Sequence, residues 1–278
     1  MSGGPLYPMV VDERLESYST FFDHSWAKAI DKLAIGTKLE VSVFNLAVNW
    51  KAAANTCVVP WLICTSVSGF VSTFLAGRSP FGDQMIDACA KRLPDEMPKL
   101  SNMRRKEMRE AIRKIGAEIK EAQDVVLHPN GVWTLLLNGA ASTEFRLSIW
   151  GSQRISYGGI YHTYENFIRE AIGLALGMSH YKAGNISVIL KDCERAFGKP
   201  IADLCLAASD IEAARRVRNA LAHNGGKETS SLHGITHGIR IENGELHIMA
   251  QDTKRLFNLL KDRAYKLTET AITHPAIR

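Results

Sequence analysis

The stretch from Ala52 to Gly77 constrains the fold more than any other feature, because it carries no charged side chain. A run of this length can cross the roughly 30 Å hydrocarbon core of a membrane. It also contains Asn55, Pro60 and several serine and threonine residues, and aromatic residues do not flank both of its ends as in a typical span. We therefore predict a buried helix, or a pair of helices broken near Pro60; a transmembrane segment over residues 52–77 is the alternative.

Elsewhere, apolar residues recur at three- and four-residue intervals, which is typical of amphipathic helices. The pattern predicts helices over residues 11–35, 101–127, 155–178, 186–197, 209–224 and 252–271. Pro94 and Pro98 interrupt it before the second of these helices. Residues 132–150 fit either a helix or a strand, and a helix is favoured because no strong stop separates them from the helix that follows.

Residues 239–248 differ, because apolar and polar side chains alternate on both sides of Asn243-Gly244. An Asn-Gly pair between two alternating runs predicts a β-hairpin. Asp252 follows as the expected cap of the last helix. The sequence therefore predicts a mainly α fold with a small β-hairpin.

Composition narrows the class of protein without naming a function. Among 278 residues, 34 Lys and Arg against 29 Asp and Glu give a net charge of +5, which tolerates a polyanionic partner without demanding one. Five cysteines without a Cys-x-x-Cys pair suggest reduced core thiols, and the first fifteen residues resemble no secretory signal, so we expect a cytoplasmic protein.

Motifs for nucleotides, metals and serine hydrolysis are missing from the sequence. It contains no P-loop, Gly-x-Gly-x-x-Gly or Gly-x-Ser-x-Gly pattern, which argues against nucleotide-dependent transferases and serine hydrolases. His233, His237 and His247 straddle a loop and a strand with no acidic or thiol fourth ligand nearby. We therefore expect neither a cofactor nor a metal ion.

The helix over residues 209–224 has a marked beginning and end. Ser209 and Glu212 have the spacing of a capping box, and Gly225-Gly226 is a typical C-terminal stop. Its final two turns carry Arg218, Asn219 and His223. Residues four apart share a helix face, so Asn219 and His223 are expected together, with Arg218 one residue aside along the same edge.

These three side chains suit the cleavage of RNA without a metal. The imidazole of His223 is of a kind that can exchange a proton with a ribose oxygen. The guanidinium of Arg218 can hold a phosphate with two parallel hydrogen bonds and offset charge that develops on its oxygens. The sequence thus predicts a phosphodiester site at this helix end.

The run RNALAH at Arg218–His223 resembles the R-N-x-x-x-H motif of the HEPN superfamily, in which it lies near the end of one helix of a four-helix bundle. A helix similar to the family's, TYENFIREAI at Thr163–Ile172, lies upstream. The resemblance covers about residues 142–272. It implies a HEPN-like four-helix bundle over residues 141–278, preceded by a helical N-terminal region, residues 1–140, of unknown role.

The resemblance also implies an activity. Many HEPN proteins are metal-independent endoribonucleases of toxin or antiviral defence systems, and they dimerise so that two motifs face each other across a cleft. Carried over, His223 is the general acid and base, Arg218 binds phosphate, and Asn219 orients the substrate or the imidazole. Glu165, on the upstream helix, is the candidate for a further polar catalytic residue.

The same reading predicts the partners. Arg215, Arg216 and Lys227 surround the motif and are expected to follow an RNA backbone. The expected partners are therefore RNA, a second copy of the chain and an inhibitor or antitoxin. The alternative is a non-catalytic helical interaction or dimerisation module, tethered to a membrane through residues 52–77.

Overall fold

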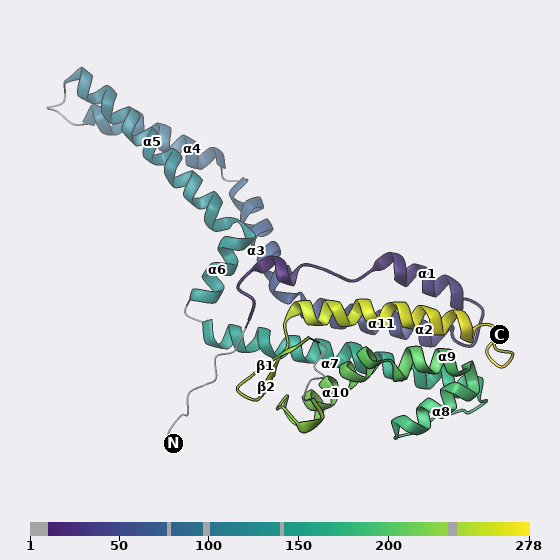
Figure 1. Ribbon diagram of the computed structural model, residues 1–278. Coiled ribbons are helices and arrows are strands. Elements are labelled where there is room, and N and C mark those ends of the chain that lie inside the picture. The colour runs from purple at the N-terminus through teal and green to yellow at the C-terminus, as the bar shows by residue number, and fades with distance from the viewer. Residues whose placement is uncertain (1–10, 77–78, 97–100, 140–141, 233–237) are drawn as a thin grey trace. The chain divides into compact units, whose positions relative to one another are not determined.

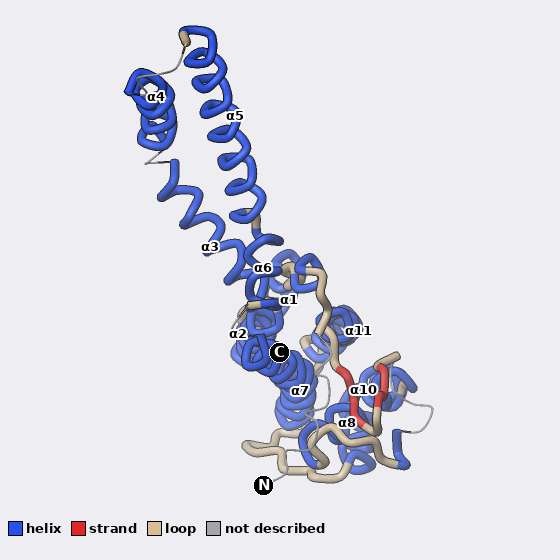
Figure 2. The backbone as a smooth tube through the Cα atoms, turned by 90° about the vertical axis from the view of Figure 1, so that its left-hand side faces the viewer, coloured by secondary structure: helices blue, strands red, loops and turns tan. Residues whose placement is uncertain are grey.

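Helices account for most of the chain in the computed structural model, which describes residues 11–76, 79–96, 101–139, 142–232 and 238–278 (Figure 1). The helices are α1 (His24–Ala34), α2 (Glu40–Cys57), α3 (Val59–Ala76), α4 (Ser79–Glu96), α5 (Asn102–Leu127), α6 (Pro129–Asn138), α7 (Ser142–Ala175), α8 (Ile186–Phe197), α9 (Lys199–Ala202), α10 (Ser209–His223) and α11 (Ala250–Ala271). Two short antiparallel strands, β1 (Arg240–Glu242) and β2 (Glu245–His247), form a hairpin that lies beside α10 (Figure 2). The prediction of a mainly α fold with a small hairpin is confirmed.

The chain divides into two compact units. One contains the described residues up to Val59 together with Arg146–Arg278, and the other contains Pro60–Phe145. The boundary expected between residues 140 and 141 lies close to the second of these divisions. The sequence pattern gives no sign that α1 and α2 pack with the C-terminal helices, because such contacts join residues far apart in the chain.

An aromatic cluster holds α1, α2, α7 and α11 of the first unit together. The rings of Trp26 and Trp50 stack with centroids 5.1 Å apart, and Phe257 meets the Trp50 ring edge-on at 5.4 Å. The indole Nε1 of Trp50 donates to the carbonyl of Ile160 and that of Trp26 to the carbonyl of Lys261, each at 2.9 Å. Buried indoles with satisfied N–H groups both fill and orient a core.

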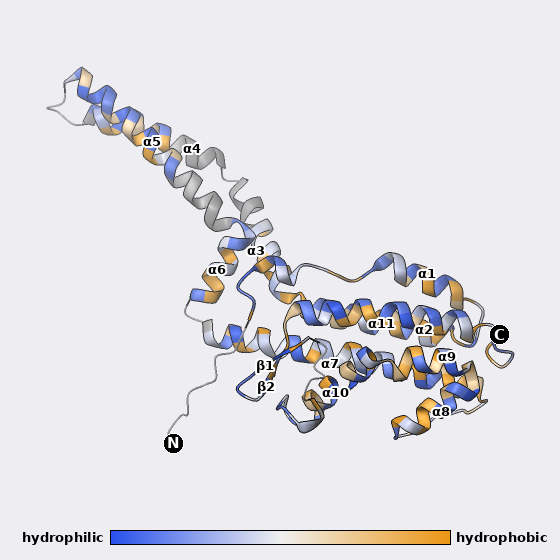
Figure 3. Cartoon of the chain, in the orientation of Figure 1, coloured by the Kyte–Doolittle hydropathy of each residue, from blue (hydrophilic) through white to orange (hydrophobic). Residues whose placement is uncertain are grey.

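The last helix, α11, supplies one wall of this core. Its predicted apolar stripe is confirmed, and hydrophobic and hydrophilic residues alternate around the helix (Figure 3). The completely buried members are Leu256, Leu260, Ala264, Leu267 and Ala271. Asp252 is not the cap as predicted, because Met249 occupies that position. Asp252 lies in the first turn and accepts a hydrogen bond from the backbone N–H of Met249, at 2.8 Å, which still stabilises the start of α11.

The prediction of one helix over residues 11–35 is wrong in its first half. Leu15–Tyr18 forms a short 3₁₀ turn, and α1 begins at His24. The side chain of Asp23 accepts a hydrogen bond from the backbone N–H of Trp26 at 2.9 Å, which starts a new helix there. The local capping bond therefore outweighs the longer apolar pattern.

The uncharged stretch breaks at Val58, between α2 and α3, which confirms the predicted break near Pro60. Ala54, Cys57 and Cys64 are buried as expected. The expectation of a buried segment fails for one side of α3, where Leu62, Ile63, Val67 and Phe70 are 38–72% exposed. Gly77, the last residue of the stretch, lies outside the described residues.

A membrane span needs a helix of about 20 mostly apolar residues. Of the described helices, no single one is long and apolar enough to cross a bilayer. The segments Glu40–Cys57 and Val59–Phe70 meet those requirements only when taken as a pair across their break.

The second unit contains a close pair of helices, α4 and α5. A Cβ atom added to Gly116 of α5 would lie 2.7 Å from the Ile86 side chain of α4, so glycine allows this approach. Asp95 of α4 pairs with Arg109 at 2.7 Å, which places part of the basic face of α5 against acidic partners. Pro94 lies within α4, so the expected interruption there is wrong, and Pro98 lies outside the described residues.

Two further predictions are confirmed. Of residues 132–150, those up to Asn138 are helical in α6 and those from Ser142 are helical in α7. The hairpin pairs Ile241 with Leu246 and turns at Asn243 and Gly244, whose φ angles of 51° and 75° are those of a type I′ turn.

Candidate functional site

The helix α10 begins differently from the prediction. Its cap position is Ala208, and no side-chain capping bond forms there, so the capping box expected from Ser209 and Glu212 is wrong. Asp210 instead accepts a hydrogen bond from Arg263 of α11 at 2.6 Å. Tertiary pairing with α11 therefore anchors the start of α10.

The other end of α10 matches the prediction. The helix stops after His223, and Gly225 and Gly226 have φ angles of 62° and 81°, which favour glycine. The backbone N–H of Gly226 donates to the carbonyl of Ala220 at 2.9 Å, and its carbonyl accepts from Leu246 of the hairpin at 2.8 Å. The hairpin thus fixes the turn that follows α10, while His223 remains exposed.

The side chain of Arg218 points from α10 towards Glu165 on α7. The two side chains form an ion pair and are only 18% and 17% exposed. The other carboxylate oxygen of Glu165 binds Arg169 at 2.7 Å, and Arg218 also donates to Oδ1 of Asn219 at 2.9 Å. The structure therefore brings Arg218 and Glu165 together, as sequence reasoning expected of a polar residue from a neighbouring helix.

The phenol ring of Tyr161 lies beneath this pair. The Arg218 guanidinium carbon is 5.9 Å from the centroid of the ring. Burial raises the pKa of Tyr161, and the charge of Glu165 adds to that shift while Arg215 and Arg218 oppose it. Tyr161 is therefore a neutral platform for the guanidinium.

Asn219 and His223 line a depression on a different side of α10 from Arg218, although Asn219 also accepts the hydrogen bond from Arg218. Arg215 and Arg216 line the same depression of about 410 Å³, which we call the outer depression. Arg216 pairs with Glu212 one turn earlier, its Nε lying 3.0 Å from the carboxylate. The expectation that Asn219 and His223 share a face is consistent with this arrangement.

The expectation that Arg218 follows the same edge is wrong. Five residues advance a helix by about 140° around its axis beyond one full turn, so Arg218 and His223 point in different directions. Among the described residues, no hydrogen bond or ion pair joins these two side chains. Lys227 is exposed beyond the helix end and does not line the outer depression.

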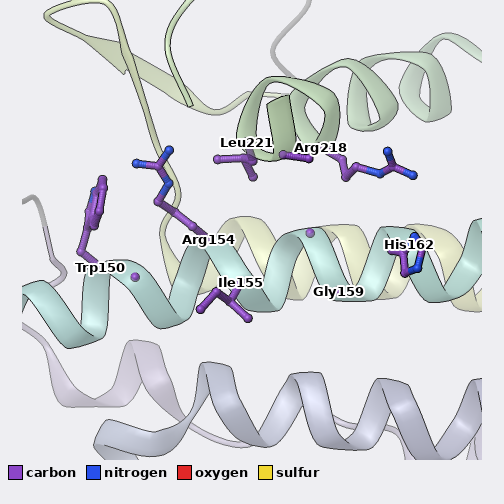
Figure 4. A pocket seen from close by; sticks show the side chains of 10 residues that line it. Trp150, Arg154, Ile155, Gly159, His162, Arg218 and Leu221 are labelled. Atoms are coloured by element: carbon purple, nitrogen blue, oxygen red, sulfur yellow. The ribbon is translucent and has the colours of Figure 1, made fainter. Parts of the chain in front are cut away.

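A groove of about 470 Å³ lies between α7 and α10, and Arg218 is one of the residues that line it (Figure 4). Trp150, Arg154 and His162 line it from α7, and Leu221 lines it from α10. The Arg154 guanidinium carbon lies 4.2 Å from the centroid of the Trp150 ring, and Arg154 also donates to the carbonyl of Gly225. Burial lowers the pKa of this arginine, and Glu245 opposes the shift.

Sequence reasoning missed the α7 side of this groove. The available signal was a repeat along one helix face, since Trp150, Arg154 and Gly158 are four residues apart. A Cβ atom added to Gly151 or Gly158 would have no neighbour within 4 Å, so the glycines leave the groove floor open. Aromatic, cationic and open features on one helix face can accommodate a base and a phosphate.

The structure adds little on metals and thiols. Within the described ranges, no group of three or more His, Cys, Asp and Glu side chains could hold a metal ion. His233 and His237 lie outside those ranges. The five cysteines are free, and burial raises the pKa of Cys57 and Cys193 to about 12, which keeps both as thiols.

Comparison with known proteins finds no match to this chain among family models, curated proteins or solved structures. The resemblance to the HEPN superfamily therefore rests on the residues of the motif and its surroundings.

Proposed function

We propose that this chain is a metal-independent endoribonuclease of the HEPN type, a cytoplasmic toxin or antiviral defence effector that cleaves RNA in a dimeric cleft. The observation that carries the proposal is the end of α10. His223 is exposed there beside Asn219, while Glu165 holds Arg218 on the adjoining side of the same two turns. A proton-transfer group and a phosphate-binding group thus flank one accessible helix end.

The packing of the first unit supports a HEPN-like bundle. α7, α10 and α11 surround a shared core, and the aromatic cluster of Trp26, Trp50 and Phe257 adds α2 to it. The upstream helix resembling the family's, Thr163–Ile172, lies within α7 and supplies Glu165. Of these helices, α7, α10 and α11 lie within the range 141–278 that the resemblance implies, and α2 comes from the N-terminal region.

The reaction requires each side chain in a separate role. His223 takes the proton of a ribose 2′-hydroxyl, the 2′-oxygen forms a bond to phosphorus, and the bond from phosphorus to the 5′-oxygen breaks. His223 then returns the proton to the leaving 5′-oxygen. Arg218 offsets the charge on the phosphate oxygens, and Asn219 orients the substrate or the imidazole.

Glu165 is better suited to positioning than to proton transfer. Both of its carboxylate oxygens are engaged by guanidinium groups, one by Arg169 and one by Arg218. A carboxylate held by two guanidinium groups fixes the direction of its partners. We therefore assign Glu165 as the positioning residue for Arg218.

A second copy of the chain accounts for the separation of Arg218 and His223. Since they face different sides of α10, one phosphate reaches both most simply when the two side chains come from different copies. An isologous dimer would bring each Arg218 towards the partner's motif and form two equivalent sites. Arg215, Arg216 and Lys227 would guide the RNA backbone, and an inhibitor or antitoxin would restrain the activity.

Cleavage of RNA in the presence of EDTA tests the proposal. The wild-type chain is expected to cleave, and His223→Ala to lose the activity while its sedimentation behaviour is unchanged. His24→Ala, which removes another exposed imidazole at the start of α1, is the matched control and should cleave normally. Unaltered cleavage by His223→Ala would rule out this site.

A second function is favoured by the exposed apolar side of α3. Leu62, Ile63, Val67 and Phe70 would suit a non-catalytic interaction module tethered to a membrane through residues 52–77. Fractionation without detergent separates the two functions. Recovery of the full chain in the soluble fraction contradicts the tether, and recovery only from membranes supports it.

A further inference from the structure

A second concave site, which we call the polar pocket, lies near the C-terminal end of α7 and has a volume of about 470 Å³. It is formed by the start of α2, the end of α7 and the segment that leads to α8. The polar side chains that matter for its chemistry are Lys38, Ser42, Arg169, Glu170, His180 and Lys182. No role in the proposed ribonuclease uses it.

Positive charge dominates this pocket. Lys38, Arg169 and Lys182 face a single lining carboxylate, Glu170, and His180 adds a further nitrogen donor or acceptor. Lys38 donates to the carbonyl of Ala276 at 2.7 Å, which leaves its other donors available. The pocket therefore favours an anion.

The neighbouring acids offset only part of the positive charge of the pocket. Asp192 of α8 is engaged by the hydroxyl of Tyr181 at 2.8 Å and by Arg195 at 3.3 Å. Glu165 is shared between Arg169 and Arg218. Asp192 is thus engaged by other groups, and Glu165 offsets part of the charge of Arg169, so the excess positive charge of the pocket lies on Lys38 and Lys182.

We infer that the polar pocket binds a small ligand with a terminal phosphate, of about the size of a nucleoside monophosphate. A volume of about 470 Å³ falls in the range of small-molecule sites, and an arginine flanked by two lysines is a suitable receptor for a phosphate. The hydroxyl of Ser42 and the imidazole of His180 supply hydrogen bonds to the rest of the ligand.

Arg169 connects this pocket to the motif. The guanidinium lines the pocket, donates to the carbonyl of Ala183 and binds Glu165, whose second oxygen binds Arg218. A phosphate that binds Arg169 competes with Glu165 for this guanidinium. The negative charge of Glu165 is then balanced more by Arg218. Ligand binding therefore tightens the Glu165–Arg218 pair and makes Arg218 less available to a second phosphate.

Isothermal titration with 5′-AMP, pyrophosphate and adenosine tests the binding site in the full-length chain. AMP and pyrophosphate are expected to bind and adenosine to fail, because phosphate is the recognised group. Lys182→Glu should weaken binding about tenfold or more, and the exposed Lys191→Glu on α8 should not. Absence of phosphate binding, or equal binding by Lys182→Glu and wild type, would overturn the inference.

Two further measurements check that loss of binding is not due to unfolding and test whether the pocket is coupled to Arg218. His180→Ala, a second pocket variant, should also weaken AMP binding, with unfolding temperatures confirming that both variants fold. The Nε–H signal of Arg218, assigned by its loss in Arg218→Lys, should shift when AMP binds to the wild type. A signal that stays fixed at saturating AMP contradicts the connection. None of these readouts depends on RNA cleavage, so the polar pocket and the proposed ribonuclease can fail separately.

Discussion

The two sides of α10 differ in how far a single chain satisfies their side chains. Toward α7, Arg218 is 18% exposed and is bound by Glu165 and Asn219 above the ring of Tyr161. On the outer side, His223 is exposed and lines an open depression with Arg215 and Arg216. One side is completed by the chain's own fold, and the other presents its groups to the surroundings.

In the proposed reaction, the two sides of α10 must meet different requirements. The pair on the α7 side must be ordered before any ligand arrives, because only an ordered guanidinium offers a phosphate a fixed geometry. The outer side must stay accessible, because an imidazole that transfers protons has to reach the substrate. The largest expected effects should therefore come from experiments that separate Arg218 from His223.

Mixing of copies tests the separation most directly. We expect Arg218→Ala and His223→Ala each to reduce RNA cleavage about 100-fold or more. A purified dimer that combines one copy of each variant should recover about half of the wild-type rate, since one of its two sites would contain both groups. The measurement is the rate of RNA cleavage by differently tagged copies purified together.

The control is a dimer in which both copies carry Arg218→Ala and the two different tags. It should stay inactive. If the combined dimer is as inactive as this control, the two side chains do not meet across copies, and the contrast between the two sides of α10 has no catalytic meaning.

A double-mutant cycle compares the ion pairs on the two sides. Glu165→Gln and Arg218→Gln should show a coupling of about 1.5 to 3 kcal/mol in the free energy of unfolding, because the pair is largely shielded from solvent. The matched cycle is Glu212→Gln with Arg216→Gln, a more exposed pair four residues apart, with an expected coupling of about 0.3 to 0.5 kcal/mol. Denaturant unfolding of the six variants measures both, and equal couplings would remove the contrast.

Local sequence signals correctly predicted where several elements stop or turn. Gly198 with φ 87° ends α8 at the expected residue, and Asn243-Gly244 turns the hairpin as expected. In each case the conformation depends on residues adjacent in sequence, which favour or permit a positive φ. The stop of α10 before Gly225 follows the same rule.

Local sequence signals could not predict features that depend on contacts between residues far apart in the chain. The sequence places Trp150 and Arg154 on one face of α7, but whether that face meets α10 depends on how the helices pack. The packing of Trp26 against Trp50 and Phe257 likewise joins residues from opposite ends of the chain. The direction of Arg218 is different, because helix geometry alone separates it from His223 by about 140°.

Arg154, which lines the groove between α7 and α10, should also stabilise the fold. Arg154→Ala removes the contact with the Trp150 ring and the hydrogen bond to Gly225, and we expect it to reduce the free energy of unfolding by about 1 to 2 kcal/mol. Arg195→Ala, on the exposed surface of α8, should change it by less than about 0.5 kcal/mol. Equal effects in denaturant unfolding would show that the groove side is no better ordered than the surface.

The smallest expected effect concerns the outer depression and its salt dependence. A cation that contacts single-stranded RNA releases a counterion, so Arg216→Gln should reduce the slope of log affinity against log salt concentration by about 0.7. Lys191→Gln, which removes an equal charge from α8 away from the depression, should leave the slope unchanged. Fluorescence anisotropy with a short single-stranded RNA in catalytically inactive His223→Ala measures both slopes. An equal reduction in the two variants would mean that RNA responds to the net charge of +5 and not to this side of α10.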